Sequence, residues 1–264
     1  MNGTILIFSD THLTTKYDRK KFELLSKLIG SSDRVIINGD FYEGYVINFG
    51  QFIASPWRNL FPLLKEKKAI YSRIKPPTLV GGTPKVSSKI YPKGVSTIPP
   101  AGYAGKIETT GFQPVVDHLF GNHDKQLSDQ EYEMFCDQAM EKVDFNQNGV
   151  TFHLFHGHGV DRTFDVRHPN IPRFIAGIIS RTEKVVCRVF GRRYLALFKP
   201  ENEILKRWKA KNLPANDWLI CGHTHLAELD EKTKFANLGL FLSEKLASYL
   251  IIEQGKINLH YVNG

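Results

Sequence analysis

The sequence predicts an α/β protein, and three features of the chain lead to this prediction. Short apolar runs rich in β-branched residues, such as 4–8 and 34–37, have the pattern of buried strands. Between them, 20–29 carries apolar residues at helical spacing. Polar residues follow several of these runs directly, and ligands of α/β sheets gather outside the carboxyl ends of strands. The same pattern therefore predicts a binding site at one edge of a sheet.

The remaining elements follow from periodicity and from turn residues. Helical patterns are expected in 47–68 (interrupted by Pro56 and Pro62), 129–142, 174–179, 185–198 and 201–211. Strands are expected at 150–155, 217–221, 234–238, 247–252 and 258–262, with Gln254-Gly255 as a turn between the last two. One further strand is predicted to begin at 69–71 and to end at 119–120.

The segment 72–117 interrupts this alternation. It holds seven of the 13 prolines and six of the 21 glycines, and it shows little helical periodicity. A structureless connection of this length is uncommon inside a compact domain. We therefore interpret 72–117 as an insertion loop at the surface of a single domain spanning 1–264. A small β-rich subdomain is the alternative.

Composition narrows the class of protein. With 264 residues, 42% hydrophobic and 23% charged, the chain is typical of a globular protein with a sizeable core. The three cysteines, Cys136, Cys187 and Cys221, match neither a disulfide framework nor a zinc ribbon. No secretory leader pattern or membrane-spanning run is present, so we expect a cytoplasmic protein.

The positive charge is concentrated in one segment. The formal net charge is +8, and 162–211 alone contains 13 lysines and arginines against four acidic residues. We interpret 160–215 as a basic helical cap that can attract phosphates, nucleic acid or an anionic membrane surface. The alternative is a solvated helical face with no partner.

The polar residues at strand ends share the chemistry of metal ligands. They are Asp10, His12, Asp40, Asn122, His123, His156, His158, His223 and His225. Imidazole and carboxylate donors suit Mn²⁺, Fe or Zn²⁺. One aspartate can bridge two ions with its two oxygens, and two ions can clamp a phosphoryl group for in-line attack. A single such histidine is more often structural, but this many together indicate a site.

The order of these motifs resembles that of the calcineurin-like metallophosphoesterases. The matching residues are Asp10-x-His12, Gly39-Asp40, Gly121-Asn122-His123-Asp124, His156 and Gly222-His223-x-His225. The resemblance implies a four-layer α/β/β/α sandwich with a dinuclear metal site, most readily manganese, with iron or zinc as alternatives. It places Asp10, His12 and His225 on one ion, and Asn122, His156 and His223 on the other. It makes Asp40 the bridge and His123 the catalytic histidine, which is no ligand and either protonates the leaving oxygen or stabilises developing charge.

Within that family, Gly-Asp-Phe-Tyr-Glu and the helical insertion before Gly222 resemble the UDP-2,3-diacylglucosamine pyrophosphatase branch. This implies hydrolysis of a phosphoester or pyrophosphate by a hydroxide bridging the ions. The substrate would be a phosphorylated small molecule or a lipid-linked nucleotide at an anionic membrane surface, which makes the protein peripheral there. Two alternatives stay open: a nucleic-acid or nucleotide phosphodiesterase, and a non-catalytic scaffold on the same fold.

Overall fold

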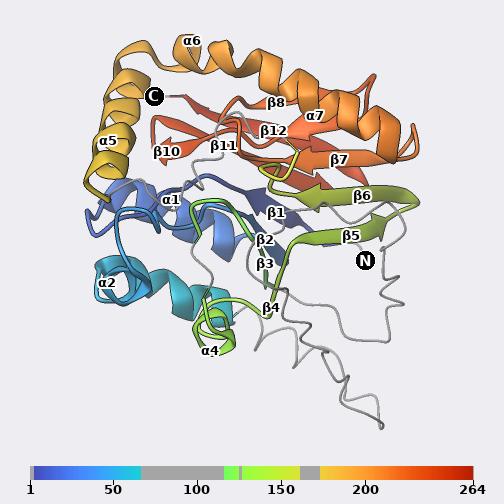
Figure 1. The fold of residues 1–264 in the computed structure, drawn as a ribbon. Helices are drawn as coiled ribbons and strands as arrows, with labels where there is room; N and C mark the ends of the chain where they lie inside the picture. Colours follow the sequence, from blue (N-terminus) through green and yellow to red (C-terminus); the bar gives the residue numbers. More distant parts are fainter. Residues whose placement is uncertain (1–2, 67–115, 125–126, 161–172, 264) are drawn as a thin grey trace, which may run out of the picture.

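Two β-sheets form the centre of the protein (Figure 1). The computed structural model describes residues 3–66, 116–124, 127–160 and 173–263. The first sheet runs β10-β11-β1-β2-β3-β4 with β12 paired to β11, and the second runs β5-β6-β7-β9-β8. The strands are β1 (Ile5–Phe8), β2 (Arg34–Asn38), β3 (Val116–Leu119), β4 (Gln138–Met140), β5 (Lys142–Gln147), β6 (Val150–Phe155), β7 (Trp218–Cys221), β8 (Glu228–Asp230), β9 (Phe235–Asn237), β10 (Phe241–Ser243), β11 (Leu246–Glu253) and β12 (Lys256–Asn263).

Helices cover the outer faces of both sheets. They are α1 (Arg19–Gly30), α2 (Phe49–Ile53), η1 (Pro56–Asn59), α4 (Asp129–Tyr132), α5 (Arg173–Phe190), α6 (Arg192–Leu195), η2 (Ala196–Phe198) and α7 (Lys199–Asn212), and 60–66 is also helical. Figure 1 shows α1 and α2 on one side of the sheets and α7 on the other. Strand β1 alternates its side chains, so Leu6 packs under α1 while Ile7 faces the second sheet. The four-layer α/β/β/α arrangement is thus confirmed.

Strand direction brings the site residues to one edge. β1, β2, β3 and β4 pair in parallel, and so do β6, β7 and β9. Parallel neighbours end at the same edge of a sheet, so the segments that follow them lie together. The turn at Gln254-Gly255 is also confirmed, because both residues have positive φ, at 51° and 79°, as a tight hairpin requires.

The helix expected over 129–142 is wrong beyond its first turn. A capping box between Ser128 and Glu131 starts α4, which ends at Tyr132. Phe135 and Cys136 then pack into the core, and 138–140 pair with β3 as strand β4. Pairing at the open edge of the sheet overrides the helical periodicity of this stretch. Strands β5, β8 and β10 were also not predicted.

Two predicted segments fall largely outside the part of the chain that the structure describes. The expected start of a strand at 69–71 lies wholly outside it. Of 72–117, only Val116 and Asp117 are described, and both belong to β3. The insertion itself stays a prediction.

The basic segment 160–215 divides into two parts where it is described. Helix α7 packs Leu205 and Trp208 on Leu219 and Phe235 and forms the outer layer over the second sheet. Helix α5 instead stands at the end of the sheets, with α6 continuing from it (Figure 1). Only α5 and α6 are therefore placed to act as a cap. Across the described ranges, no helix has the length and apolarity needed to cross a membrane.

Candidate metal centre

The residues predicted as ligands converge from both sheets. The segments after β1, β2 and β3 supply Asp10, His12, Asp40, Asn122 and His123, and those after β6 and β7 supply His156, His223 and His225. Hydrogen bonds join the two sets. The His223 amide donates to Asp10 Oδ2 at 3.1 Å, and His156 Nδ1 lies 2.8 Å from the Asn38 carbonyl oxygen. The centre therefore lies in the seam between the sheets.

Backbone strain is concentrated at this centre. Eight non-glycine residues in the described part have positive φ, and five of them are predicted ligands. These five are Asp10, His12, Asp40, His223 and His225, with φ between 42° and 70°. Such conformations cost on the order of 1–3 kcal/mol each and persist where the surroundings enforce them. The fold thus uses strained turns to aim these side chains inward.

Glycines at the site allow close approach of the ligands. A Cβ on Gly121 would lie 2.0 Å from Asp40 Oδ1, and one on Gly222 would lie 2.6 Å from Asp10 Oδ2. Gly121 is not among the described glycines with positive φ, so its conformation alone does not require glycine. Its role is to leave room for the Asp40 carboxylate.

The first group of donors contains Asp10, His12 and His225, as the resemblance implied. His225 Nε2 lies 3.4 Å from Asp10 Oδ1 and 3.1 Å from His12 Nε2. All three donor atoms fall within 4.8 Å of one another, which is the spacing of ligands around a single ion. Burial alone would raise the pKa of Asp10, but His156 and His225 lower it to about 2.

The second group is built on Asp40 and His156. His156 Nε2 lies 3.2 Å from Asp40 Oδ2, and these two form a candidate cluster with Asp10. His223 Nδ1 lies 3.0 Å from Asn122 Oδ1. Although burial opposes it, His156 and His123 hold the pKa of Asp40 well below its ordinary value. The carboxylate is thus an anion in a buried setting.

Asp40 belongs to the second group and also faces His12 of the first, while Asp10 is the carboxylate common to both groups. The Oδ2 atom of Asp40 is 3.2 Å from His156 Nε2 and 3.9 Å from His12 Nε2. Its Oδ1 accepts a hydrogen bond from the His123 amide at 2.8 Å. Asp40 would thus help to hold ions here, and Oδ2 is the oxygen that faces histidine nitrogens of both groups.

The unpaired atoms at the centre fit divalent cations. Asp10 Oδ1 and His156 Nε2 are buried and make no hydrogen bond of good geometry within the described residues. Such orphaned groups are costly, and a bound ion is a recognised explanation for them. His12 Nε2 and His225 Nε2 also face each other, as two nitrogens aimed at one ion would. The donors are imidazole, carboxylate and amide oxygen, which suit Mn²⁺, Fe²⁺ and Zn²⁺.

Carboxylates behind the histidines were missed by the sequence analysis. Buried Glu43 lies 3.2 Å from His12 Nδ1 and 2.7 Å from His123 Nδ1. Glu183 of α5 lies 2.7 Å from His225 Nδ1. Carboxylates in this position fix the tautomer and orientation of a ligating histidine. Glu43 had a signal in Gly-Asp-Phe-Tyr-Glu, whereas nothing near Glu183 in the sequence marks it.

His123 lies beside the centre with both ring nitrogens facing carboxylates, and its donor atom also forms a candidate cluster with those of His12 and Glu43. Its Nδ1 is engaged by Glu43, and its Nε2 lies 3.9 Å from Asp40 Oδ2. Burial lowers its pKa, but Asp40 and Glu43 outweigh burial and raise the pKa to about 9. Without ions at the centre, the imidazole therefore carries a proton at neutral pH, and a protonated imidazole can act as a general acid.

Two further residues of the motifs support the loop. Asp124 Oδ1 accepts from the Phe41 amide at 3.0 Å, and Asp124 Oδ2 lies 3.2 Å from His118 Nε2. Asp124 thereby ties the segment after β3 to the segment after β2. His158 is buried, with its ring centroid 5.6 Å from that of His156, but it belongs to none of the donor groups.

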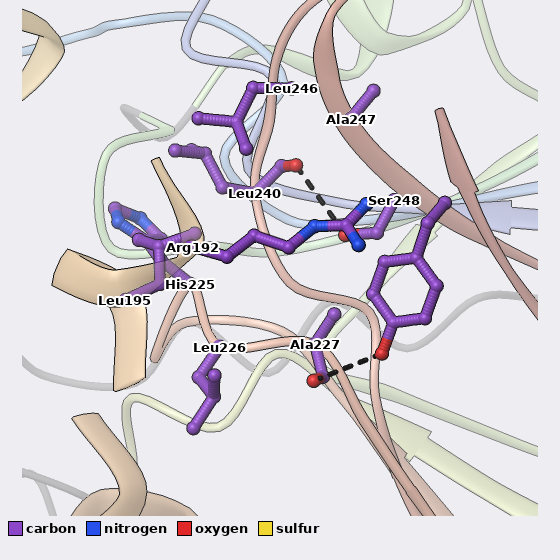
Figure 2. A pocket seen from close by; sticks show the side chains of 10 residues that line it. Arg192, Leu195, His225, Leu226, Ala227, Leu240, Leu246, Ala247 and Ser248 are labelled. Atoms are coloured by element: carbon purple, nitrogen blue, oxygen red, sulfur yellow. Dashed lines mark hydrogen bonds between the residues drawn. The ribbon is translucent and has the colours of Figure 1, made fainter. Parts of the chain in front are cut away.

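A mostly apolar pocket of about 310 Å³ adjoins the centre (Figure 2). His225 lies at one end, and Leu195, Leu226, Leu240 and Leu246 form much of the wall. Arg192 also lines the pocket, with its guanidinium carbon 4.1 Å from the ring centroid of Tyr261. The pocket can thus take an apolar group beside an anionic one.

No family model matches the sequence, and no curated protein matches it. Solved structures do. A predicted phosphoesterase from Streptococcus pneumoniae is 15% identical, with 98% of this chain and 89% of that chain covered and a TM-score of 0.40. Yfce, a phosphoesterase from E. coli, is 15% identical with 98% and 100% covered, TM-score 0.43. Vacuolar Protein Sorting 29 from Cryptosporidium parvum is 14% identical with 98% and 97% covered, TM-score 0.42. These low values define no family, so the assignment below depends on the geometry of the centre.

Proposed function

We propose that this protein is a metal-dependent phosphoesterase of the calcineurin-like kind. The observation that carries the proposal is the convergence of two groups of nitrogen and oxygen donors, one of Asp10, His12 and His225 and the other of Asp10, Asp40 and His156. In this assignment Asp10, His12 and His225 hold one divalent ion, Asn122, His156 and His223 hold the other, and Asp40 is shared. We propose Mn²⁺ as the first choice, with Fe or Zn²⁺ as alternatives.

The chemistry follows from what surrounds that centre. Two divalent ions in such a site polarise a phosphoryl oxygen and neutralise charge on the attacking and leaving oxygens. His123, oriented by Glu43, holds a proton next to this position and donates it to the leaving oxygen. A non-catalytic scaffold would have no use for a protonated histidine fixed in this place, and so we favour an enzyme.

The activity assay is direct. Purified protein freed of metal and then given Mn²⁺ should hydrolyse bis-p-nitrophenyl phosphate, p-nitrophenyl phosphate or a UDP-sugar, since together these represent diesters, monoesters and pyrophosphates. Chelation should abolish turnover and renewed Mn²⁺ should restore it. Chains that bind two ions yet turn over none of the three, with Mn²⁺, Fe²⁺ or Zn²⁺, would favour the scaffold instead.

The finer proposal is a lipid-linked nucleotide as substrate, as in the UDP-2,3-diacylglucosamine pyrophosphatase branch. The apolar pocket next to His225 supports it, because a soluble nucleotide needs no such wall. Helix α5 supports it too. Ile178, Val185 and Val189 lie on one face of α5 and are 47%, 57% and 69% exposed. An exposed apolar face next to basic residues is typical of helices that lie in a membrane interface.

We also propose that this face of α5 binds an anionic lipid surface, which would make the protein peripheral on the cytoplasmic side of a membrane. The argument is charge complementarity, because Arg181 on α5 and Arg193 on the adjoining α6 are both exposed. Each basic residue near an anionic surface contributes about 1 kcal/mol. Reversing Arg181 and Arg193 to Glu should therefore lower co-sedimentation with phosphatidylglycerol vesicles by roughly tenfold or more.

The matched control reverses Lys232 and Lys256 to Glu. Both lysines are exposed. Lys232 lies in the turn before β9 and Lys256 is the first residue of β12, so both lie at the edge of the sheets opposite to the metal centre. This control should bind vesicles as the wild type does. The membrane proposal is wrong if the wild type does not sediment with phosphatidylglycerol vesicles. It is also wrong if the two double variants lose co-sedimentation to the same extent. If the protein binds DNA rather than the vesicles, the phosphodiesterase alternative is favoured.

A further inference from the structure

We propose that Glu183 of α5 is a positioning residue for the metal ligand His225, so that docking of the cap helix and loading of the first ion site depend on each other. This inference rests on the proposed metal centre. In the described part of the chain, the hydrogen bond and ion pair of Glu183 are both with His225, and neither involves another proposed ligand or His123. Glu183 acts through the ring of His225.

The geometry of His225 sets out the first step. Its Nδ1 lies 2.7 Å from Glu183 Oε1, while its Nε2 lies 3.4 Å from Asp10 Oδ1. When Nδ1–H donates to the carboxylate, the lone pair of Nε2 is left facing Asp10 and His12. A carboxylate behind a histidine in this way fixes the tautomer, orients the ring and raises its basicity.

The origin of the carboxylate is the second step. His12 Nδ1 is met by Glu43 and His156 Nδ1 by the Asn38 carbonyl at 2.8 Å, and both partners follow or end β2 in the core. Glu183 instead belongs to α5. His225 therefore has its supporting group on the cap, whereas His12 and His156 have theirs in the core.

The third step is the way in which α5 contacts the rest of the protein. One turn after Glu183, Cys187 is buried against Leu240, Leu242 and Leu195. The face carrying Ile178, Val185 and Val189 points to solvent. Glu183 thus adds a polar contact to this apolar one, and its hydrogen bond with His225 links α5 to the metal centre.

The two events are linked by reciprocity. If a docked α5 strengthens ion binding through His225, a bound ion must stabilise the docked α5 by the same free energy. Removal of a supporting carboxylate typically weakens metal affinity by about 10–100-fold. The loss should fall on the site of Asp10, His12 and His225 and spare the site of His156.

The test is calorimetric titration of metal-free full-length protein with Mn²⁺ alone. The wild type should show two binding events, and Glu183→Ala should weaken one by about 10–100-fold while leaving the other within about threefold. Glu183→Gln keeps a hydrogen-bond acceptor but loses the charge, so its affinity for Mn²⁺ at this site should lie between those of the wild type and Glu183→Ala. Glu231→Gln is the matched control, since it removes a carboxylate from an exposed turn, and it should titrate as the wild type does.

The second readout separates positioning from a purely structural role. Mn²⁺ should slow hydrogen exchange in α5 of the wild type and of Glu231→Gln, and it should not do so in Glu183→Ala. If Glu183→Ala binds Mn²⁺ at both sites with the affinities of the wild type, the inference is overturned, even if the amide hydrogens of α5 exchange faster. If Glu183→Ala fails to fold, Glu183→Gln decides by the same criterion. If the wild type binds no Mn²⁺, Fe²⁺ or Zn²⁺, the proposed function itself fails and the inference fails with it.

Discussion

Replacement of Asp40 by asparagine should remove bound metal and phosphoesterase activity together. Asn can keep an oxygen for the His123 amide, which now bonds Asp40 Oδ1 at 2.8 Å. The amide nitrogen would then stand in place of Oδ2, facing His156 Nε2 at 3.2 Å, and it has no lone pair for an ion. Loss of one outer carboxylate costs about 10–100-fold in affinity, so loss of a shared ligand should cost more than about 100-fold.

The metal content is measured by elemental analysis after gel filtration. The activity is measured as turnover of bis-p-nitrophenyl phosphate. Asp144→Asn is the control: Asp144 is a half-exposed carboxylate on β5 that pairs with His153, away from the centre. The control should keep two ions per chain and full activity. An Asp40→Asn protein that retains both ions would show that Asp40 does not bridge them.

Replacement of His123 by alanine should leave both ions bound and lower the rate by about 10²–10⁴-fold. The imidazole is protonated at neutral pH, with its pKa raised to about 9 by Asp40 and Glu43 against the effect of burial. It is placed to supply the leaving oxygen with a proton. Rates of the variant and the wild type should be measured on p-nitrophenyl phosphate and on phenyl phosphate, with elemental analysis alongside.

The dependence on leaving group identifies the role. Phenol is a poor leaving group and needs the proton, so the loss should be greater for phenyl phosphate than for p-nitrophenyl phosphate. His260→Ala is the control, since His260 is exposed on β12 and stacks on Tyr249. Equal losses on the two esters would reassign His123 to substrate binding, and loss of metal would reassign it to the ligand set.

The strand ends were predictable from the sequence because burial on both faces leaves a continuous apolar run. Residues 5–8 and 218–221 are fully buried and were found for this reason. Each is followed at once by polar residues that have little reason to lie beside a core strand unless they act there. Parallel pairing explains why Asp10 and Asp40 lie together, but Asp10 and His225 follow strands of different sheets, and they meet in one donor group only because the two sheets pack against each other.

What could not be predicted depends on partners distant in the chain. The stretch 138–140 has no strand periodicity of its own and becomes β4 only by pairing with 117–119. Glu183 lies 42 residues before His225 and meets it only when α5 docks. Glu43 resembles any acidic residue after a strand until the rings of His12 and His123 are placed around it.

The seam between the sheets has a consequence for how the chain matures. Asp10 comes from the first strand and His225 from the turn after β7, so their donor group spans most of the sequence. Under the proposed assignment, a chain emerging from the ribosome can hold neither ion until β7 has been made and the second sheet has packed on the first. Each ion would then join the two sheets, and the strained turns that aim the ligands would be secured last, when the metal arrives.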